Sequence, residues 1–176
     1  MGHDGAPPPE AYETVTDPER FAVVVERAAG LVARLERDYR VARGPVGPDD
    51  LGPGLTASAL WVIRLVPDEP RAAPLTLAAT PFPGVSALFG RTCLISYPSC
   101  GCDACAEDPA RLTEELEADV ADLVEGRFSE AVSREATRHA FVGPTRSRRG
   151  SQTRARGDGV VEAEFDYRPW TPRRAP

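Results

Sequence analysis

Apolar residues near the N-terminus recur with the spacing of an amphipathic helix. Asp17-Pro18 is a typical helix start, because aspartate can cap free N–H groups and proline fits the first turn. The apolar side chains that follow fall at i, i+3, i+4 and i+7, which places them on one face. They are Phe21, Val24, Val25, Ala28, Leu31, Val32, Leu35 and Tyr39. The spacing predicts one helix over about residues 18–41.

The next part of the chain changes to a period of two. Residues 60–66, 75–80, 85–89 and 92–97 are rich in apolar residues that largely alternate, and short turns separate them. Alternation is typical of half-buried strands, and short turns join antiparallel neighbours. The pattern therefore predicts a four-strand antiparallel meander, with Gly90-Arg91 as the turn of its last hairpin.

A second helix and further strands are expected after the meander. Asp108-Pro109 repeats the helix-start signature, and an apolar stripe runs to Val124 before Gly126 ends the helix. The acidic residues off this stripe are expected to form a solvated face: Glu114, Glu115, Glu117, Asp119 and Asp122. Residues 128–142 fit either a strand or another helix, whereas residues 160–167 alternate as a final strand.

Together these elements predict a single α+β domain built as a two-layer sandwich, with both helices on one face of the sheet. We expect residues 17–142 to form this domain, and residues 160–176 to add its final strand and an extended tail. In that tail, Trp170 is expected to dock on the sheet. Residues 1–16, rich in glycine and proline, are expected to be disordered, and the arginine-rich residues 143–159 to be a flexible loop.

Charge is distributed unevenly along the chain. The 176 residues carry 21 basic and 27 acidic side chains, and every basic residue is an arginine. Residues 1–137 have a net charge of −11, and residues 138–176 have a net charge of +5. An acidic body repels the phosphate backbone of nucleic acids. We therefore expect nucleic-acid contact only through residues 143–159, if anywhere.

Signals for a membrane or for export are missing. No apolar run approaches the roughly 20 residues that a membrane-spanning helix needs. The first ten residues contain neither the basic stretch nor the apolar stretch of a secretory signal. We therefore expect a cytoplasmic protein without a membrane partner.

A cluster of cysteines is the most distinctive chemical feature. Cys100, Cys102 and Cys105 lie between the last strand of the predicted meander and the second predicted helix. Thiolates at i, i+2 and i+5 in a tight turn can converge on one ion, and Gly101 allows such a turn. The spacing predicts a zinc site whose fourth ligand is unknown. His139 can complete it only if the fold brings it near.

Other interpretations of the cluster stay open. Asp103 or Asp108 could supply an oxygen ligand to a metal. Residues 102–105 also form a C-x-x-C pattern at the start of a helix, which favours thiol redox chemistry, although nearby acidic residues raise thiol pKa values. Alternatively, the cysteines are small reduced residues that fill a corner of the core. Cys93 lies in a predicted strand and is expected to belong to the core.

The block from Tyr97 to Cys105 resembles the signature of a family of uncharacterised actinobacterial proteins that carry a domain of unknown function. Residues 73–76, residues 80–84 and the first predicted helix are similar as well, so the resemblance spans about residues 17–135. It implies an actinobacterial, cytoplasmic protein, in agreement with the absence of lysine. It implies no activity and assigns no catalytic residue. Residues 143–159 depart from the family pattern.

No catalytic constellation accompanies the cysteines. His3 and His139 are the only histidines, and the common nucleotide-binding and zinc-protease motifs are missing. We therefore expect a non-enzymatic binding or adaptor domain that meets another protein through its open sheet face or its helix groove, with a structural metal at the cysteines. The alternative is a thiol-redox or zinc-dependent enzyme or sensor that uses Cys100, Cys102 and Cys105.

Overall fold

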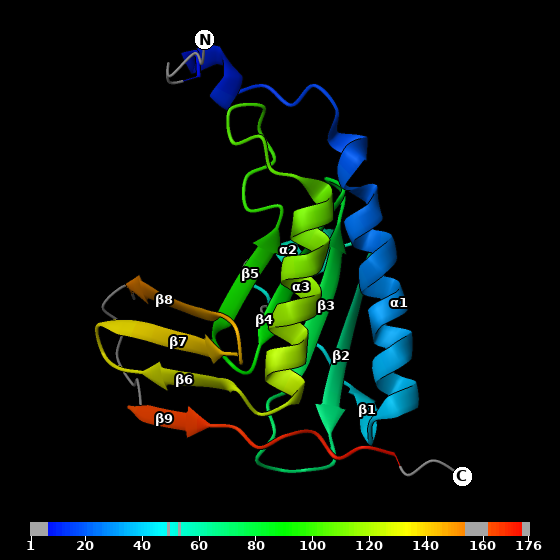
Figure 1. The fold of residues 1–176 in the computed structure, drawn as a ribbon, viewed down its shortest axis with the longest axis vertical. Coiled ribbons are helices and arrows are strands. Elements are labelled where there is room, and N and C mark those ends of the chain that lie inside the picture. Colours follow the sequence, from blue (N-terminus) through cyan, green and yellow to red (C-terminus); the bar gives the residue numbers. More distant parts are fainter. Residues whose placement is uncertain (1–6, 49, 53, 154–161, 174–176) are drawn as a thin grey trace.

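The computed structural model describes residues 7–48, 50–52, 54–153 and 162–173, which form two antiparallel sheets and two long helices (Figure 1). The helices are α1 (Ala22–Asp38), α2 (Leu55–Ser58) and α3 (Pro109–Val124), and the 3-10 turns are η1 (Pro9–Tyr12) and η2 (Pro18–Phe21). The first sheet contains β1 (Val41–Gly44), β2 (Trp61–Pro67), β3 (Leu75–Thr80), β4 (Gly84–Phe89) and β5 (Cys93–Tyr97). The second contains β6 (Phe128–Val132), β7 (Ala136–Val142), β8 (Ser147–Thr153) and β9 (Ala163–Asp166).

The predicted meander is confirmed, with one additional strand at its edge. Strands β2 to β5 pair in chain order, and each pair is antiparallel. The extra strand is β1, which pairs with β2 and begins where we expected the helix to end. Helix α1 ends at Asp38 because Tyr39 is extended and forms an isolated bridge with Pro172.

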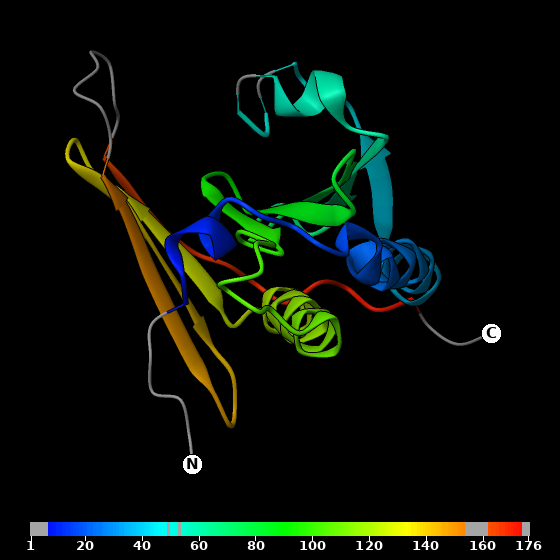
Figure 2. The same cartoon turned by 90° about the horizontal axis from the view of Figure 1, so that it is seen from above.

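Helices α1 and α3 lie side by side and cover one face of the first sheet, as the two-layer prediction requires (Figures 1 and 2). Their apolar stripes form the core with the inner face of the sheet. The Asp108 side chain accepts a hydrogen bond from the Ala110 N–H, so the predicted cap of α3 is confirmed. Asp17 precedes η2 but makes no such cap.

The second sheet has the strand order β8-β7-β6-β9 and corrects part of our prediction for the C-terminal half. Residues 128–142, which fitted either type of element, form the β6–β7 hairpin. Residues 147–153 form β8 and pair with β7, so this part of residues 143–159 is not a flexible loop. Residues 154–159 of that expected loop, and the first two residues of the predicted final strand, lie outside the described residues.

Buried ion pairs explain why an arginine-rich segment becomes a strand. Asp119 and Asp122 on α3 are 0% and 2% exposed, so our prediction that they belong to a solvated face is wrong. Arg146 lies 2.7 Å from Asp119 and 2.8 Å from Asp122, and Arg148 lies 2.7 Å from Asp119. The Tyr97 hydroxyl also donates to Asp119, at 2.5 Å. The second sheet therefore covers this side of α3 and neutralises its carboxylates.

An aromatic cluster joins the two sheets into one core. The ring centroids of Phe89 on β4 and Phe141 on β7 are 5.1 Å apart, and those of Phe128 and Phe141 are 4.8 Å apart. The buried Glu130 carboxylate accepts hydrogen bonds from the backbone N–H groups of Arg91, at 2.8 Å, and Thr92, at 2.9 Å. Residues of both sheets therefore share one hydrophobic core.

The C-terminal tail docks as expected. Trp170 is 2% exposed, and its indole N–H donates to the Ala73 carbonyl at 2.8 Å. Its backbone N–H donates to the Val124 carbonyl at the end of α3. In the described part of the chain, no helix is both long enough and apolar enough to cross a membrane.

Candidate metal centre

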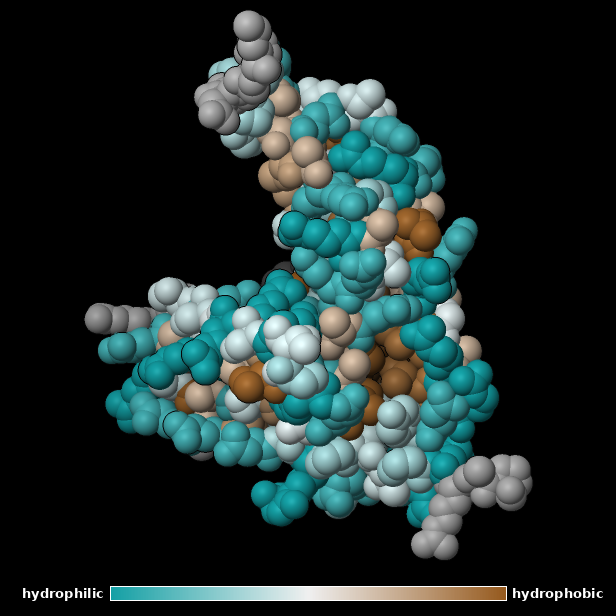
Figure 3. Space-filling view, viewed as in Figure 1, coloured by the Kyte–Doolittle hydropathy of each residue, from teal (hydrophilic) through white to brown (hydrophobic). Residues whose placement is uncertain are grey.

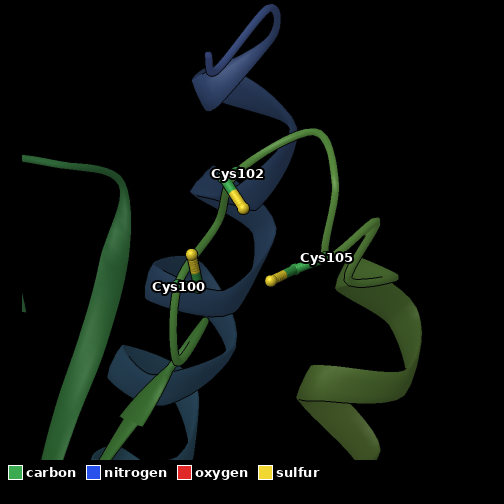
Figure 4. A group of neighbouring side chains, drawn as sticks. All are labelled: Cys100, Cys102 and Cys105. Carbon is green, nitrogen blue, oxygen red and sulfur yellow. The ribbon is translucent and has the colours of Figure 1, made fainter. Parts of the chain in front are cut away.

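The side chains of three cysteines on the loop between β5 and α3 lie close to one another. The sulfur atoms of Cys100, Cys102 and Cys105 all lie within 4.8 Å of one another, and the side chains point toward a common space (Figure 4). Thiolates that share a tetrahedral zinc ion lie about 3.8 Å apart, as expected from Zn–S bonds of about 2.3 Å. Small rotations of the side chains would therefore bring the sulfurs to the separation that zinc requires.

The bend that gathers the sulfurs depends on Gly101. This residue has a φ of 80°, in the left-handed region that favours glycine. A Cβ atom at this position would lie 2.7 Å from the ring of Phe82 and 3.2 Å from Pro98. The prediction that Gly101 permits a tight bend is confirmed. Ala106 also has a positive φ, 47°, so the loop is tightly turned on both sides of Cys105.

The Glu107 carboxylate stabilises the bend of the cysteine loop. Its carboxylate accepts hydrogen bonds from the backbone N–H groups of Ser99, Cys100 and Gly101, at 2.9, 3.1 and 2.8 Å. Burial alone would raise the pKa of Glu107, but these N–H donors hold it below the ordinary value. The sequence patterns did not predict this role for Glu107. Its only signal was an acidic residue a few positions after a glycine bend.

The thiols of Cys102 and Cys105 differ in acidity. The pKa of Cys102 is lowered, first by a hydrogen bond from the Cys100 thiol and then by the backbone N–H of Cys105. The pKa of Cys105 is raised to about 12, because its thiol proton is shared with the Cys102 and Cys100 sulfurs. A metal that binds all three sulfurs must therefore displace protons, as thiolate-bound metals do.

The other candidate ligands lie elsewhere or have other partners. Among the described residues, the cysteine group contains neither a histidine nor a carboxylate. His139 lies on β7 in the second sheet, and burial lowers its pKa. Asp103 accepts hydrogen bonds from Thr16, and Asp108 caps α3. Cys93 is 2% exposed on β5, which confirms that it belongs to the core.

The N-terminal segment docks on the cysteine loop. The Asp103 N–H donates to the Thr14 carbonyl at 2.9 Å, and the Ala104 N–H donates to the Ala11 carbonyl at 3.0 Å. The Thr16 N–H and hydroxyl donate to the Asp103 carboxylate. The expectation of disorder is therefore wrong for residues 7–16, because hydrogen bonds to the cysteine loop hold this segment. Residues 1–6 lie outside the described residues.

A hollow between α1 and α3 is the second notable surface feature. It has a volume of about 530 Å³ and an apolar lining that includes Leu31, Leu35 and Val120. Acidic side chains stand around it, among them Glu114 and Glu117. Figure 3 shows apolar atoms at the bottom of a depression over the two helices. This is the helix groove that the sequence analysis considered as a contact surface.

The family is decided by a match along almost the whole chain. A family model described as a family of unknown function, DUF6226, matches residues 2–174. The chain belongs to DUF6226. This match includes both sheets, the cysteine loop and the tail, and so extends beyond the residues 17–135 on which the resemblance was based. No curated protein and no solved structure matches the chain. DUF6226 membership therefore assigns no activity, and function has to be argued from the cysteine loop.

Glu107→Gln is expected to weaken metal binding at the loop about 10- to 100-fold, the usual effect of losing a group that orients the ligands. The substitution keeps the size of the side chain but removes the charge that three N–H groups share. Competition with a chromogenic chelator measures the affinity. Glu115→Gln, on the outer side of α3, is the control and should bind as the wild type does. Equal affinities for both variants would show that Glu107 does not organise the loop.

Proposed function

We propose that this protein is a non-enzymatic binding domain whose cysteine loop holds a thiophilic metal ion, with zinc as the first candidate. The observation that carries the proposal is the convergence of three sulfur atoms within 4.8 Å on a short loop. Soft thiolate ligands select zinc and copper(I) over magnesium or calcium. The residues that would hold the ion are Cys100, Cys102 and Cys105.

The surroundings of the sulfurs favour a structural role for the ion. The loop joins β5 to α3 and also carries the N-terminal segment through Asp103 and Ala104. An ion at this point would tie three parts of the chain together. Because Cys100 and Cys105 are exposed, the ion would remain accessible to a chelator and to an outside ligand at its fourth position.

Metal content tests the proposal directly. Protein purified under reducing conditions from zinc-supplemented cultures should contain about one zinc ion per chain, because one set of three sulfurs can hold one ion. The variant Cys100→Ser/Cys102→Ser/Cys105→Ser should contain none, and Cys93→Ala should retain the ion. Elemental analysis of the purified proteins gives the ratio. A wild-type protein that binds neither zinc nor copper(I), and whose melting temperature is unchanged by a chelator, would refute the proposal.

A dithiol–disulfide couple is the second candidate. The lowered pKa of Cys102 beside the Cys105 thiol is the observation that favours it. Glutathione disulfide would accept two electrons, a Cys102–Cys105 bond would form, and two glutathione thiols would be released. Mass spectrometry after alkylation detects that bond. If it forms in the cell and no metal is bound, the redox function replaces the metal function.

The broader setting of the protein is also part of the proposal. The absence of lysine is typical of the GC-rich coding that suggests an actinobacterial origin, and the four free cysteines are consistent with the cytoplasmic location that we propose. The adaptor role implies a protein partner. The hollow between α1 and α3 fits a segment with apolar and basic side chains, because its lining is apolar and its edge is acidic.

A further inference from the structure

One face of the second sheet is left uncovered by the rest of the described chain. Successive side chains of a strand point to opposite faces. Phe128, Glu130, Phe141 and Arg148 point toward the first sheet and α3, where their partners lie. Figure 2 shows the second sheet nearly edge-on, with its other face turned away from the molecule. A shallow groove of about 600 Å³ runs over that outer face.

Strand register arranges the outer side chains in two rows across the sheet. From β8 to β9, the first row is Ser151, Arg138, Ala131 and Glu164, and the second row is Arg149, Ala140, Ser129 and Asp166. Each row has an arginine on the β8–β7 side, a carboxylate on β9, and a small residue on β6. The outer face is therefore positive on one side, negative on the other and flat in the middle.

These charged side chains are available to a partner. Arg138, Arg149, Glu164 and Asp166 are all exposed. None of them takes part in an ion pair with another of the described residues. By contrast, Arg146 and Arg148 are held by the carboxylates of α3. The outer arginines thus keep their charge for an external contact.

We propose that a second copy of this chain covers the outer face, related by a two-fold axis that runs along the strands. Such an axis places β8 of one copy over β9 of the other. In the second row, Arg149 then lies over Asp166 of the other copy, and Ala140 lies over Ser129. In the first row, Arg138 lies over Ala131 and beside Glu164. A two-fold interface requires a surface that complements itself, and both rows meet this requirement.

The same pattern argues against an unrelated occupant. Binding of a different protein or a small molecule does not require that the charges of the two halves of the face be opposite. A two-fold contact with a second copy does require it, because each half then meets the other half. The small residues Ser129 and Ala131 on β6 and Ala140 on β7 allow the middle of the two sheets to approach closely. Four strands spaced about 4.8 Å apart give a face only about 19 Å wide, so the interface is small and we expect a reversible dimer that weakens with added salt.

Charge-swap variants test the dimer. Sedimentation velocity of the full chain at increasing concentration and low salt should show a monomer–dimer equilibrium for the wild type. Arg138→Glu/Arg149→Glu and Glu164→Arg/Asp166→Arg should each be monomeric, and their equimolar mixture should dimerise again. The swap Arg111→Glu/Glu115→Arg, at an exposed ion pair on α3, is the control and should dimerise like the wild type.

Several outcomes would overturn the proposal. These are a wild type that stays monomeric at every concentration, swapped variants that dimerise as well as the wild type, and a mixture that stays monomeric although circular dichroism shows both variants to be folded. Dimerisation should be the same with and without a chelator, because the outer face lies on the second sheet and not at the cysteine loop. The test therefore stands whether or not the cysteines bind a metal.

Discussion

Asp119→Ala is expected to lower the free energy of unfolding by about 3 kcal/mol, the lower end of the cost of removing one partner from a buried ion pair. The carboxylate is fully buried and contacts Arg146, Arg148 and the Tyr97 hydroxyl. Without it, the buried hydroxyl loses its acceptor, Arg148 loses its counter-charge, and Arg146 keeps only Asp122. The lower end applies because both arginines are partly exposed. Denaturant unfolding monitored by circular dichroism measures the change.

An exposed ion pair on the same helix supplies the control. Glu117 pairs with Arg34 at 3.1 Å, and the side chains of Arg34 and Glu117 are 45% and 36% exposed. Glu117→Ala should therefore cost less than about 1 kcal/mol. Hydrogen exchange in residues 147–153 should rise in Asp119→Ala and stay unchanged in Glu117→Ala. If both variants lost the same stability, the buried network would not be what holds β8 on the molecule.

Removal of the proposed metal ion is expected to release the N-terminal segment. Residues 11–16 are fixed to the cysteine loop by backbone hydrogen bonds of Asp103 and Ala104 and by the Thr16–Asp103 contacts. A loop that loses its ion samples more conformations and holds these bonds for less of the time. Hydrogen exchange of the Thr16, Asp103 and Ala104 amides, whose N–H groups donate across this contact, should therefore be at least about tenfold faster after chelation, while exchange in β3 and β4 stays the same.

Two variants make this prediction specific. Asp103→Ala removes the side-chain acceptor of the Thr16 N–H but no thiol, so exchange of the Thr16 amide should rise while the zinc content stays unchanged. The triple cysteine-to-serine variant should behave like the chelated wild type. Equal protection of the Thr16, Asp103 and Ala104 amides in loaded and chelated protein would show that the ion and the N-terminal segment are independent of each other.

Local patterns in the sequence were sufficient for four of the five strands of the first sheet and for its two long helices. Alternation predicted β2 to β5, and helical spacing predicted α1 and α3, because each of these elements buries a continuous apolar face. β1 was missed, since its sequence Val-Ala-Arg-Gly carries little apolar signal and only its pairing with β2 makes it a strand. Helix α1 was predicted too long because Tyr39 fits the apolar stripe, although it is extended and pairs with Pro172.

The second sheet shows where local patterns fail. β8 reads Ser-Arg-Arg-Gly-Ser-Gln-Thr, with no apolar residue, and its position depends on β7 and on carboxylates of α3 that lie more than twenty residues away in the chain. The same long-range contacts turned Asp119 and Asp122 from expected surface residues into buried ones. A sequence pattern does not reveal which acidic residues of a helix will meet an arginine from another element.

The candidate site could also be predicted only in part from the sequence. Cys100, Cys102 and Cys105 were found from spacing alone, because they lie on one short loop. The residues that organise this loop were not found. Glu107 acts through backbone N–H groups, and residues 11–16 come from a segment that is distant in sequence. Neither kind of contact leaves a recognisable motif.

The docked tail has a consequence for synthesis of the protein. The Trp170 side chain is buried in the core next to Ala73. The tail also forms isolated bridges, from Pro172 to Tyr39 after α1 and from Arg168 to Ala72 before β3. The first sheet and α1 leave the ribosome long before this tryptophan does. While translation continues, the incomplete domain must expose the apolar cavity that the indole later occupies. Released chains that are truncated before residue 170 should consequently bind holdase chaperones more strongly than the full-length chain.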